Sequence, residues 1–464
     1  MNGRPERSEG PACSHSRLLL AAFALSACGP ANARVAVDTT ATFQTMSGWE
    51  TTAQAGSESP SYPLYRDTLV KLAANDLALN RVRLEVRSGV EHTRDYWREG
   101  QAGRLRGTDY RCGRYETVND NADPRVIAWS GFQFSELDHT VETLVLPLRD
   151  AIAARGQRMV LNVTYVSFFR QCPKDRRYDH RDADEYAEFV LATTLHLRDK
   201  YALVPDLWEV ILEPDNTDDW GSAAIGDAIV ASAARLRENG FAFRFVAPSN
   251  TQAEAAVRYY DGLRTVVGAN KEVEELGYHR YRWITRWTLR DIAERRRRDG
   301  VKTAMLEHIG SGVDDLLDDL TIAQVSAWSQ YALAYANDQD NGGLYYRIDQ
   351  RDPKHPLVRE GSRTRFLRQV FKTAQLGAIR IGATSDSRAA RPVAFRNPNG
   401  GVGLAVRTAR AANVSVTGLP AGRYGISSAT EERERDSLPD VVIPLGGAVN
   451  ASISGAGVLT LLAR

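Results

Sequence analysis

The sequence predicts an α/β fold: a (β/α)8 TIM barrel with a C-terminal antiparallel β-sandwich side domain. The chain has 464 residues, of which 43% are hydrophobic, and this length favours a globular protein with two domains. From about residue 45 to 375, short apolar segments alternate with longer amphipathic ones, which indicates βα units and a parallel sheet. After about residue 376 the helical period is absent, and short strands separated by Gly, Pro and Asn follow.

Residues 1–33 are interpreted as a leader. A basic stretch ends at Arg17, and the apolar segment 18–27 then fits a signal sequence and is too short to span a bilayer. The residues ending at Cys28 resemble the lipobox of bacterial lipoproteins, in which the cysteine is lipidated. A signal-peptidase site after Ala33 is the alternative. Both readings predict a protein of the bacterial cell envelope, the periplasm or the outside, and lipidated Cys28 would attach it to a membrane.

The barrel is predicted over 47–375, from eight strands that alternate with helices. The strands are expected at 44–49, 79–86, 158–166, 207–212, 243–248, 276–281, 302–307 and 342–348. Helices are expected at 66–75, 140–155, 182–200, 223–239, 289–298 and 321–337. The insertion at about 88–137 is long enough to indicate a functional wall of the barrel mouth.

The side domain is predicted over 376–464, with a contribution from the start of the mature chain. Its strands are expected at 379–385, 392–397, 402–408, 413–418, 423–429, 441–445 and 457–463. Residues 34–46 alternate between apolar and polar side chains, so we expect them to add a strand to this sandwich. The small domain would then be built from both ends of the chain.

Charge and cysteine content narrow the function classes. The net charge is +1, from 59 basic and 58 acidic residues, so the overall field predicts no nucleic-acid partner. No metal-binding motif or nucleotide loop is found, and we predict no metal and no cofactor. Cys112 and Cys172 form an even pair in an exported chain, which favours a disulfide over two separate thiols. A monomer is expected.

Two glutamates end strands of the predicted barrel. Glu213 ends the fourth strand and Glu307 ends the seventh. The carboxyl ends of barrel strands line one open mouth, so these side chains would face each other across a cleft. Paired carboxylates are the groups that glycoside hydrolysis needs, one as proton donor and one as nucleophile, about 5 to 5.5 Å apart in retaining enzymes.

Five further residues are expected to bind substrate or to hold the two glutamates in place. Arg83 on the second strand would keep a nucleophilic carboxylate ionised. His279 and Tyr281 alternate at the end of the sixth strand and would point into the mouth. Asn250 ends the fifth strand. Trp49 offers a flat face for a sugar ring, with burial in the core as an equal alternative.

These residues resemble the site of clan A retaining glycoside hydrolases, and the chain is most similar to family 30, the glucosylceramidase and xylanase group. The Asn-Glu-Pro of the acid/base is matched by Leu212-Glu213-Pro214, the nucleophile by Glu307, and the His-x-Tyr by His279-Arg280-Tyr281. The segments 43–49 and 366–385 also resemble that family. The resemblance implies a retaining hydrolase that cleaves a poly- or oligosaccharide.

Departures from the family pattern leave an alternative. The Asn that contacts the sugar 2-hydroxyl is replaced by Leu212, and the Thr before the nucleophile by Leu306. A surface carbohydrate-binding protein with a decayed site is therefore the second hypothesis, and transglycosylation shares the first half of the hydrolytic mechanism. Arginines crowd the second-strand loop and follow the last strand, so they favour either a uronate-bearing glycan or ordinary salt bridges.

Overall fold

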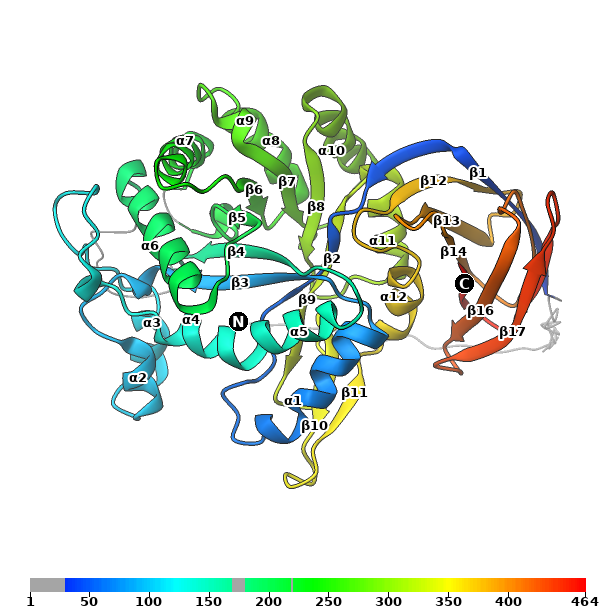
Figure 1. Ribbon diagram of the computed structural model, residues 1–464, viewed down its shortest axis with the longest axis horizontal. Coiled ribbons are helices and arrows are strands. Elements are labelled where there is room, and N and C mark those ends of the chain that lie inside the picture. Colours follow the sequence, from blue (N-terminus) through cyan, green and yellow to red (C-terminus); the bar gives the residue numbers. More distant parts are fainter. Residues whose placement is uncertain (1–29, 169–179, 218–219) are drawn as a thin grey trace, which may run out of the picture.

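The structure is a computed structural model, which describes residues 30–168, 180–217 and 220–464. A closed parallel barrel and a separate antiparallel sheet lie side by side (Figure 1). Cys28 and Cys172 lie outside the described residues, so the lipidation and the disulfide stay predictions. Cys112 is buried in the helix α3 (Gly107–Gly113). Among the helices of the described ranges, none combines the length and the apolarity needed to cross a bilayer.

Eight parallel strands close the barrel. They are β2 (Gly48–Thr52), β3 (Arg81–Arg87), β4 (Val160–Val166), β5 (Leu207–Glu209), β6 (Arg244–Asn250), β7 (Val273–His279), β8 (Lys302–Glu307) and β9 (Ala327–Tyr335). Closure is complete because β9 pairs with both β2 and β8. Strands such as β4 are buried along their whole length, as expected where helices cover the outside and side chains fill the inside.

Helices surround the barrel strands. They are α1 (Tyr62–Lys71), η1 (Leu72–Asp76), α4 (Ser135–Thr140), η4 (Val141–Val145), α5 (Leu146–Ala153), α6 (Ala183–Tyr201), α7 (Ser222–Glu238), α8 (Ala253–Leu263), α9 (Ala269–Glu272), α10 (Arg286–Asp299), α11 (Val313–Asp318), η7 (Asp319–Ala323) and α12 (Thr364–Phe371). Local capping fixes several ends: the Asp182 carboxylate accepts backbone N–H groups at the start of α6, and Gly300 ends α10 in the left-handed conformation.

The last barrel strand corrects the sequence prediction. The helix expected at 321–337 is wrong, because this segment holds β9. The strand expected at 342–348 is β10 (Leu344–Asp349). It pairs with the C-terminal part of β9, from Ala332 to Tyr335, and with β11 (Leu357–Glu360). The β9 residues are buried on both faces, and a short apolar run of that kind fits a buried helix as well as a buried strand.

The side domain is a nine-stranded sheet in the order β17-β16-β19-β14-β13-β12-β1-β15-β18. Its strands are β1 (Ala31–Thr45), β12 (Ile379–Ser385), β13 (Ala390–Arg396), β14 (Val402–Thr408), β15 (Ala412–Thr417), β16 (Gly422–Thr430), β17 (Asp436–Ile443), β18 (Val449–Ile453) and β19 (Gly457–Ala463). β1 lies antiparallel to β12 and parallel to β15, so the start of the described chain completes the sandwich as expected. β1 begins at Ala31, three residues before the predicted boundary, and β18 was not predicted.

The long insertion after β3 contains η2 (Ser88–Val90), α2 (Tyr96–Gln101), α3 (Gly107–Gly113) and η3 (Trp129–Gly131). Several of its residues line the mouth of the barrel, among them Arg114 and Tyr115. The insertion is therefore one wall of the site, as its length predicted.

Candidate active site

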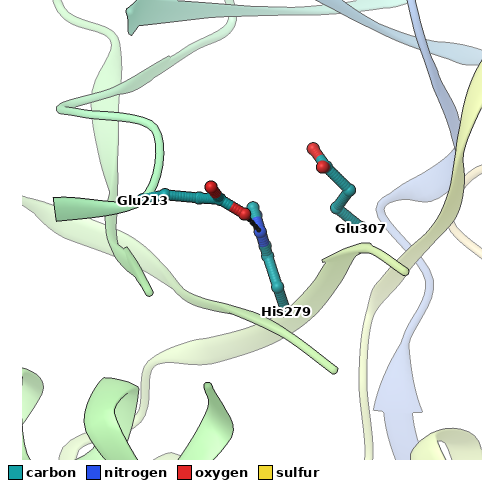
Figure 2. A group of neighbouring side chains, drawn as sticks. All are labelled: Glu213, His279 and Glu307. Carbon is teal, nitrogen blue, oxygen red and sulfur yellow. Dashed lines mark hydrogen bonds and ion pairs between the residues drawn. The ribbon is translucent and has the colours of Figure 1, made fainter. Parts of the chain in front are cut away.

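Glu213 and Glu307 come from opposite parts of the barrel and meet at its mouth. Glu307 is the last residue of β8, and Glu213 follows the fourth barrel strand, β5. One carboxylate oxygen of each glutamate and a ring nitrogen of His279 all lie within 4.8 Å of one another. Figure 2 shows the two carboxyl groups directed toward the same space, with His279 below Glu213. The two glutamates are only 7% and 6% exposed.

The backbone at Glu213 has a special conformation. Its φ of 53° lies in the left-handed region, which is uncommon for a residue with a Cβ. The turn η6 (Pro214–Asn216) follows at once, and the Asp215 carboxylate accepts both the backbone N–H of Thr251 at 2.8 Å and its hydroxyl at 2.7 Å. Asp215 thereby ties the Glu213 turn to the end of β6, a positioning role that the sequence did not reveal.

Both oxygens of the Glu307 carboxylate have hydrogen-bond donors. The guanidinium of Arg83 donates to Oε2, and the Tyr281 hydroxyl donates to Oε1 at 2.6 Å. Arg83 also donates to the Thr52 hydroxyl at 3.0 Å. These contacts fix the rotamer of Glu307 and place a permanent positive charge beside its carboxylate.

Glu213 has a different set of neighbours. Its Oε1 lies 3.1 Å from Nδ1 of His279, and its Oε2 accepts from the Asn216 amide at 3.1 Å. His279 is fully buried, and burial opposes its protonation. The hydrogen bond to Glu213 and the negative charge of Glu307 outweigh burial, so the pKa of His279 is raised above its usual value. The imidazole and the Glu213 carboxyl group are therefore joined by one hydrogen bond, which favours the protonated imidazole.

Beneath the two glutamates, the barrel interior contains further charged residues. Glu209 on β5 lies 3.7 Å from Arg83, and both side chains are fully buried. Burial raises the pKa of Glu209, although Arg83 opposes this effect. One layer lower, Arg81 is bonded to Glu50 and, at 2.8 Å, to Glu275. Each buried arginine thus has carboxylate partners, without which its burial would be strongly unfavourable.

The cleft above this layer has a volume of about 530 Å³ and is lined by side chains from several barrel loops. Glu213, Glu307 and Tyr281 line it, so the structure brings these three predicted residues together at one surface. Arg83 and His279 lie behind the glutamates and are fully buried, so they position Glu307 and Glu213 and present no surface to a substrate.

Two predicted substrate contacts are wrong. Trp49 is 1% exposed, stacks on Phe371 with ring centroids 4.4 Å apart, and donates its indole N–H to the carbonyls of Phe371 and Ala374. It is a core residue between the barrel and α12. Asn250 is fully buried at the end of β6, and Thr251 lines the cleft in its place.

Several lining residues were not singled out from the sequence. They are Gln54, Tyr115, Phe168, Asn216, Ile309 and Tyr331. Tyr331 was hidden because its strand was assigned as a helix. Glu85 and Arg87 also line the cleft; they were visible in the sequence as alternating charges on the second strand, at the spacing that places side chains on the same face.

The arginines of the insertion and the last strand have acidic partners. Arg87 contacts Glu85 and Glu136, and Arg114 contacts Glu136. After β10, Arg351 and Arg359 both contact Asp349. Of the two interpretations offered by the sequence, the structure shows the salt-bridged one for these arginines.

Oxygen and nitrogen atoms of Glu213, His279 and Glu307 are close enough to ligate one metal ion. Both oxygens of Glu307 already accept from Arg83 and Tyr281. A cation at this point would therefore have to compete with a fixed guanidinium group, and the expectation of no metal stays a prediction.

A barrel of this topology with a side sandwich defines a fold that known proteins share. The catalytic domain of a family 30 glycoside hydrolase, xylanase C from Talaromyces cellulolyticus, matches with a TM-score of 0.66 and 13% identity over 93% of this chain and 100% of that domain. A subfamily 8 xylanase of that family from Clostridium acetobutylicum matches with a TM-score of 0.65 and 15% identity over 93% of this chain and 99% of that one.

An endo-β-1,6-glucanase matches with a TM-score of 0.65 and 14% identity, over 93% of each chain. No protein-family model matches the sequence, and no curated protein matches it either. At these identities the likeness shows the fold. The fold class and the resemblance to family 30 are thereby confirmed.

Proposed function

We propose that the protein is a retaining glycoside hydrolase that cleaves O-glycosidic bonds of a poly- or oligosaccharide by double displacement. The observation that carries this proposal is that a carboxylate oxygen of Glu213 and one of Glu307 lie within 4.8 Å of each other at an open cleft. Retaining enzymes have carboxyl groups about 5 to 5.5 Å apart, whereas inverting enzymes leave about 6.5 to 9.5 Å for a water molecule. The family 30 folds support the same reaction class.

In the first step Glu307 attacks the anomeric carbon and Glu213 transfers a proton to the departing oxygen. Arg83 and Tyr281 hold the Glu307 carboxylate in place and aimed into the cleft. His279, 3.1 Å from Oε1 of Glu213, holds the Glu213 carboxyl group in position for this proton transfer.

In the second step the glycosyl-enzyme ester on Glu307 is hydrolysed. Glu213, now without its proton, takes one from the incoming water, which attacks the anomeric carbon and releases Glu307. The departing carboxylate returns to its two donors. The same residues thus serve both halves of the reaction, and the product keeps the configuration of the substrate.

Leu212 makes this site differ from the family pattern. Its side chain packs with Tyr115 and Phe168 at the wall of the cleft, so it offers no amide to a sugar hydroxyl. We expect the loss of this contact to lower the rate, because hydrogen bonds to the 2-hydroxyl strengthen in the transition state. The substitutions at Leu212 and Leu306 are also the observation that favours the second candidate, a carbohydrate-binding protein without turnover.

The test is a screen of the purified chain against a panel of polysaccharides, followed by Glu213→Gln and Glu307→Gln on the substrate found. A hydrolase loses turnover in both variants, whereas a binding protein has no turnover and keeps its affinity. Glu99→Gln is the matched control, since that carboxylate pairs with Arg94 away from the cleft. Hydrolysis that survives in either active-site variant would contradict the assignment.

We further propose that the chain is a lipoprotein of the cell envelope, attached through Cys28. Residues 31–33 pair with Ala412, Asn413 and Val414 in β15, and Ala31 and Ala33 are buried there. Cleavage after Ala33 would remove these contacts, whereas cleavage before Cys28 keeps them. Cys28→Ala tests this: the variant should leave the membrane fraction, and unchanged partitioning would contradict lipid attachment.

A further inference from the structure

A second hollow of about 180 Å³ adjoins the catalytic cleft, and we call it the side pocket. Four residues line both spaces: Gln54, Glu85, Arg87 and Arg114. A hollow of this size has room for several water molecules. That is enough for the polar edge of one sugar ring.

An aromatic path leads from the cleft into the side pocket. Tyr331 lines the cleft and Tyr335 lines the side pocket, and both come from β9. They stand four residues apart on the same face of the strand, with ring centroids 6.4 Å apart. Tyrosine rings present flat apolar faces with a polar tip, which suits a chain of sugar rings passing from one ring to the next.

The side pocket has a fixed outer wall. Besides Tyr335, the residues that line the side pocket but not the cleft are residues 53 and 55–58 of the loop after β2, and Glu136 and Thr140 of α4. Gly56 has a φ of +68°, and a Cβ there would lie 2.5 Å from the backbone nitrogen of Ala336. The loop is therefore pressed against the end of β9, and a glycan chain that enters from the cleft meets this wall.

Both guanidinium groups of the side pocket are paired. Glu136 accepts hydrogen bonds from Tyr96, Arg114 and, at 3.2 Å, Arg87, so its oxygens are occupied. Glu85 accepts from Gln54 at 3.2 Å and from Arg87 at 2.8 Å. The exposed Glu58 adds a third carboxylate to the lining, so the side pocket carries one more negative than positive charge and a uronate would find no unpaired cation among these side chains.

Glu85 and Arg87 instead present complementary polar edges. Each oxygen of Glu85 accepts one hydrogen bond from the protein and keeps a further lone pair, and Arg87 adds N–H donors beside it. Neighbouring sugar hydroxyls both donate and accept, so an uncharged sugar can satisfy this pair without disturbing its charge balance.

We propose that the side pocket is a subsite for the uncharged terminal sugar of a glycan, with Glu85 as the residue that selects it. This inference rests on the proposed hydrolase function and deepens it: cleavage would occur near a chain end, on neutral glycans in preference to uronates. Tyr335 would stack on the bound ring, while Glu85 and Arg87 bind its hydroxyls.

The test measures binding of single sugars to the full chain by saturation-transfer NMR titration, with glucose, xylose, glucuronic acid and glucosamine as probes. Glu85→Gln and Tyr335→Ala change the side pocket, and Tyr335 lines it without lining the cleft. Glu99→Gln again controls for loss of a carboxylate, because Glu99 lines neither the side pocket nor the cleft. Binding requires no turnover, so this readout is separate from the Glu213→Gln test of hydrolysis.

We expect glucose or xylose to bind more tightly than both charged sugars. Both side-pocket variants should weaken that binding about tenfold, the effect of losing one hydrogen bond to a charged group or one ring contact, and the control should bind as the wild type does. Tighter binding of either charged sugar, wild-type binding in Tyr335→Ala, or no binding of the neutral sugars would overturn the proposal. If Glu85→Gln fails to fold, Tyr335→Ala carries the same prediction.

Discussion

Arg83→Met is expected to destabilise the protein by an amount that depends on pH. Arg83 is fully buried, donates to Glu307 and Thr52, and lies 3.7 Å from Glu209. Methionine fills most of the volume but leaves two carboxylates without their cation. Removing one partner of a buried ion pair costs about 3–5 kcal/mol in the free energy of unfolding.

The pH dependence follows from Glu209. Burial raises the pKa of this carboxyl above its unfolded value, so its ionised form opposes folding at high pH and proton uptake relieves this effect as the pH falls. In the absence of Arg83 the relief should be larger. The destabilisation should therefore be greater at about pH 8 than at about pH 5.

The assay is urea unfolding followed by tryptophan fluorescence at both pH values. Arg66→Met is the matched control, because the Arg66–Asp67 pair is 41% and 83% exposed and should contribute less than about 1 kcal/mol. If Arg83→Met lowers the free energy of unfolding no more than the control does, or lowers it equally at both pH values, Arg83 is not the cation that stabilises the buried carboxylates.

Three further outcomes are expected. By NMR, His279 should titrate above its ordinary pKa. Glu213→Gln should lower that pKa, because the amide carries no negative charge to favour the imidazolium, and an unchanged pKa would contradict the coupling of His279 to Glu213. Burial raises the pKa of Glu136, but two arginines outweigh it and lower that pKa to about 2. The stabilising contribution of Glu136 is therefore complete above its unfolded pKa and should be lost as the pH falls from about 4.5 to 2, by up to about 3 kcal/mol. Acid titrations of stability, with Glu136→Gln for comparison, measure this loss. Trp49→Ala should lower the free energy of unfolding by about 3–5 kcal/mol and leave the affinity for glycan unchanged, and a selective loss of glycan binding would show that its core assignment is wrong.

Most of the fold could be predicted from the sequence because parallel barrel strands and their helices have different periods. The segments that lead to Glu213 and Glu307 were recognisable as apolar runs closed by an ionisable residue, and their order along the chain placed both at one mouth, although β5 itself already ends at Glu209. The exception is β9. Its alanines, leucine and aromatic residues suit either a helix or a strand, and only its pairing with β2 and β8 decides between them.

The site was predictable to the extent that it depends on strand ends. Tyr281 follows β7, the strand that pairs with β8, so its contact with Glu307 follows from the strand order, whereas Arg83 reaches Glu307 from β3, which is separated from β8 by β9 and β2. Trp49 was misjudged because it packs outward against Phe371 of α12, and Asn250 because it is buried at the end of β6; which side of a strand faces inward, and how deep its end lies, depend on the register of all the strands. The Asp215–Thr251 bond joins two segments that become neighbours only when β5 and β6 pair, and the Tyr331–Tyr335 pair was hidden because β9 was assigned as a helix.

The most direct test of the double-displacement mechanism is to trap the glycosyl-enzyme intermediate with an activated 2-fluoro glycoside of the sugar that the substrate screen identifies. A double-displacement enzyme with Glu307 as nucleophile gives one covalent adduct, located by peptide mass mapping on Glu307 and absent from Glu307→Gln. An adduct on any other residue, or turnover that releases a product of inverted configuration with no adduct, would contradict it.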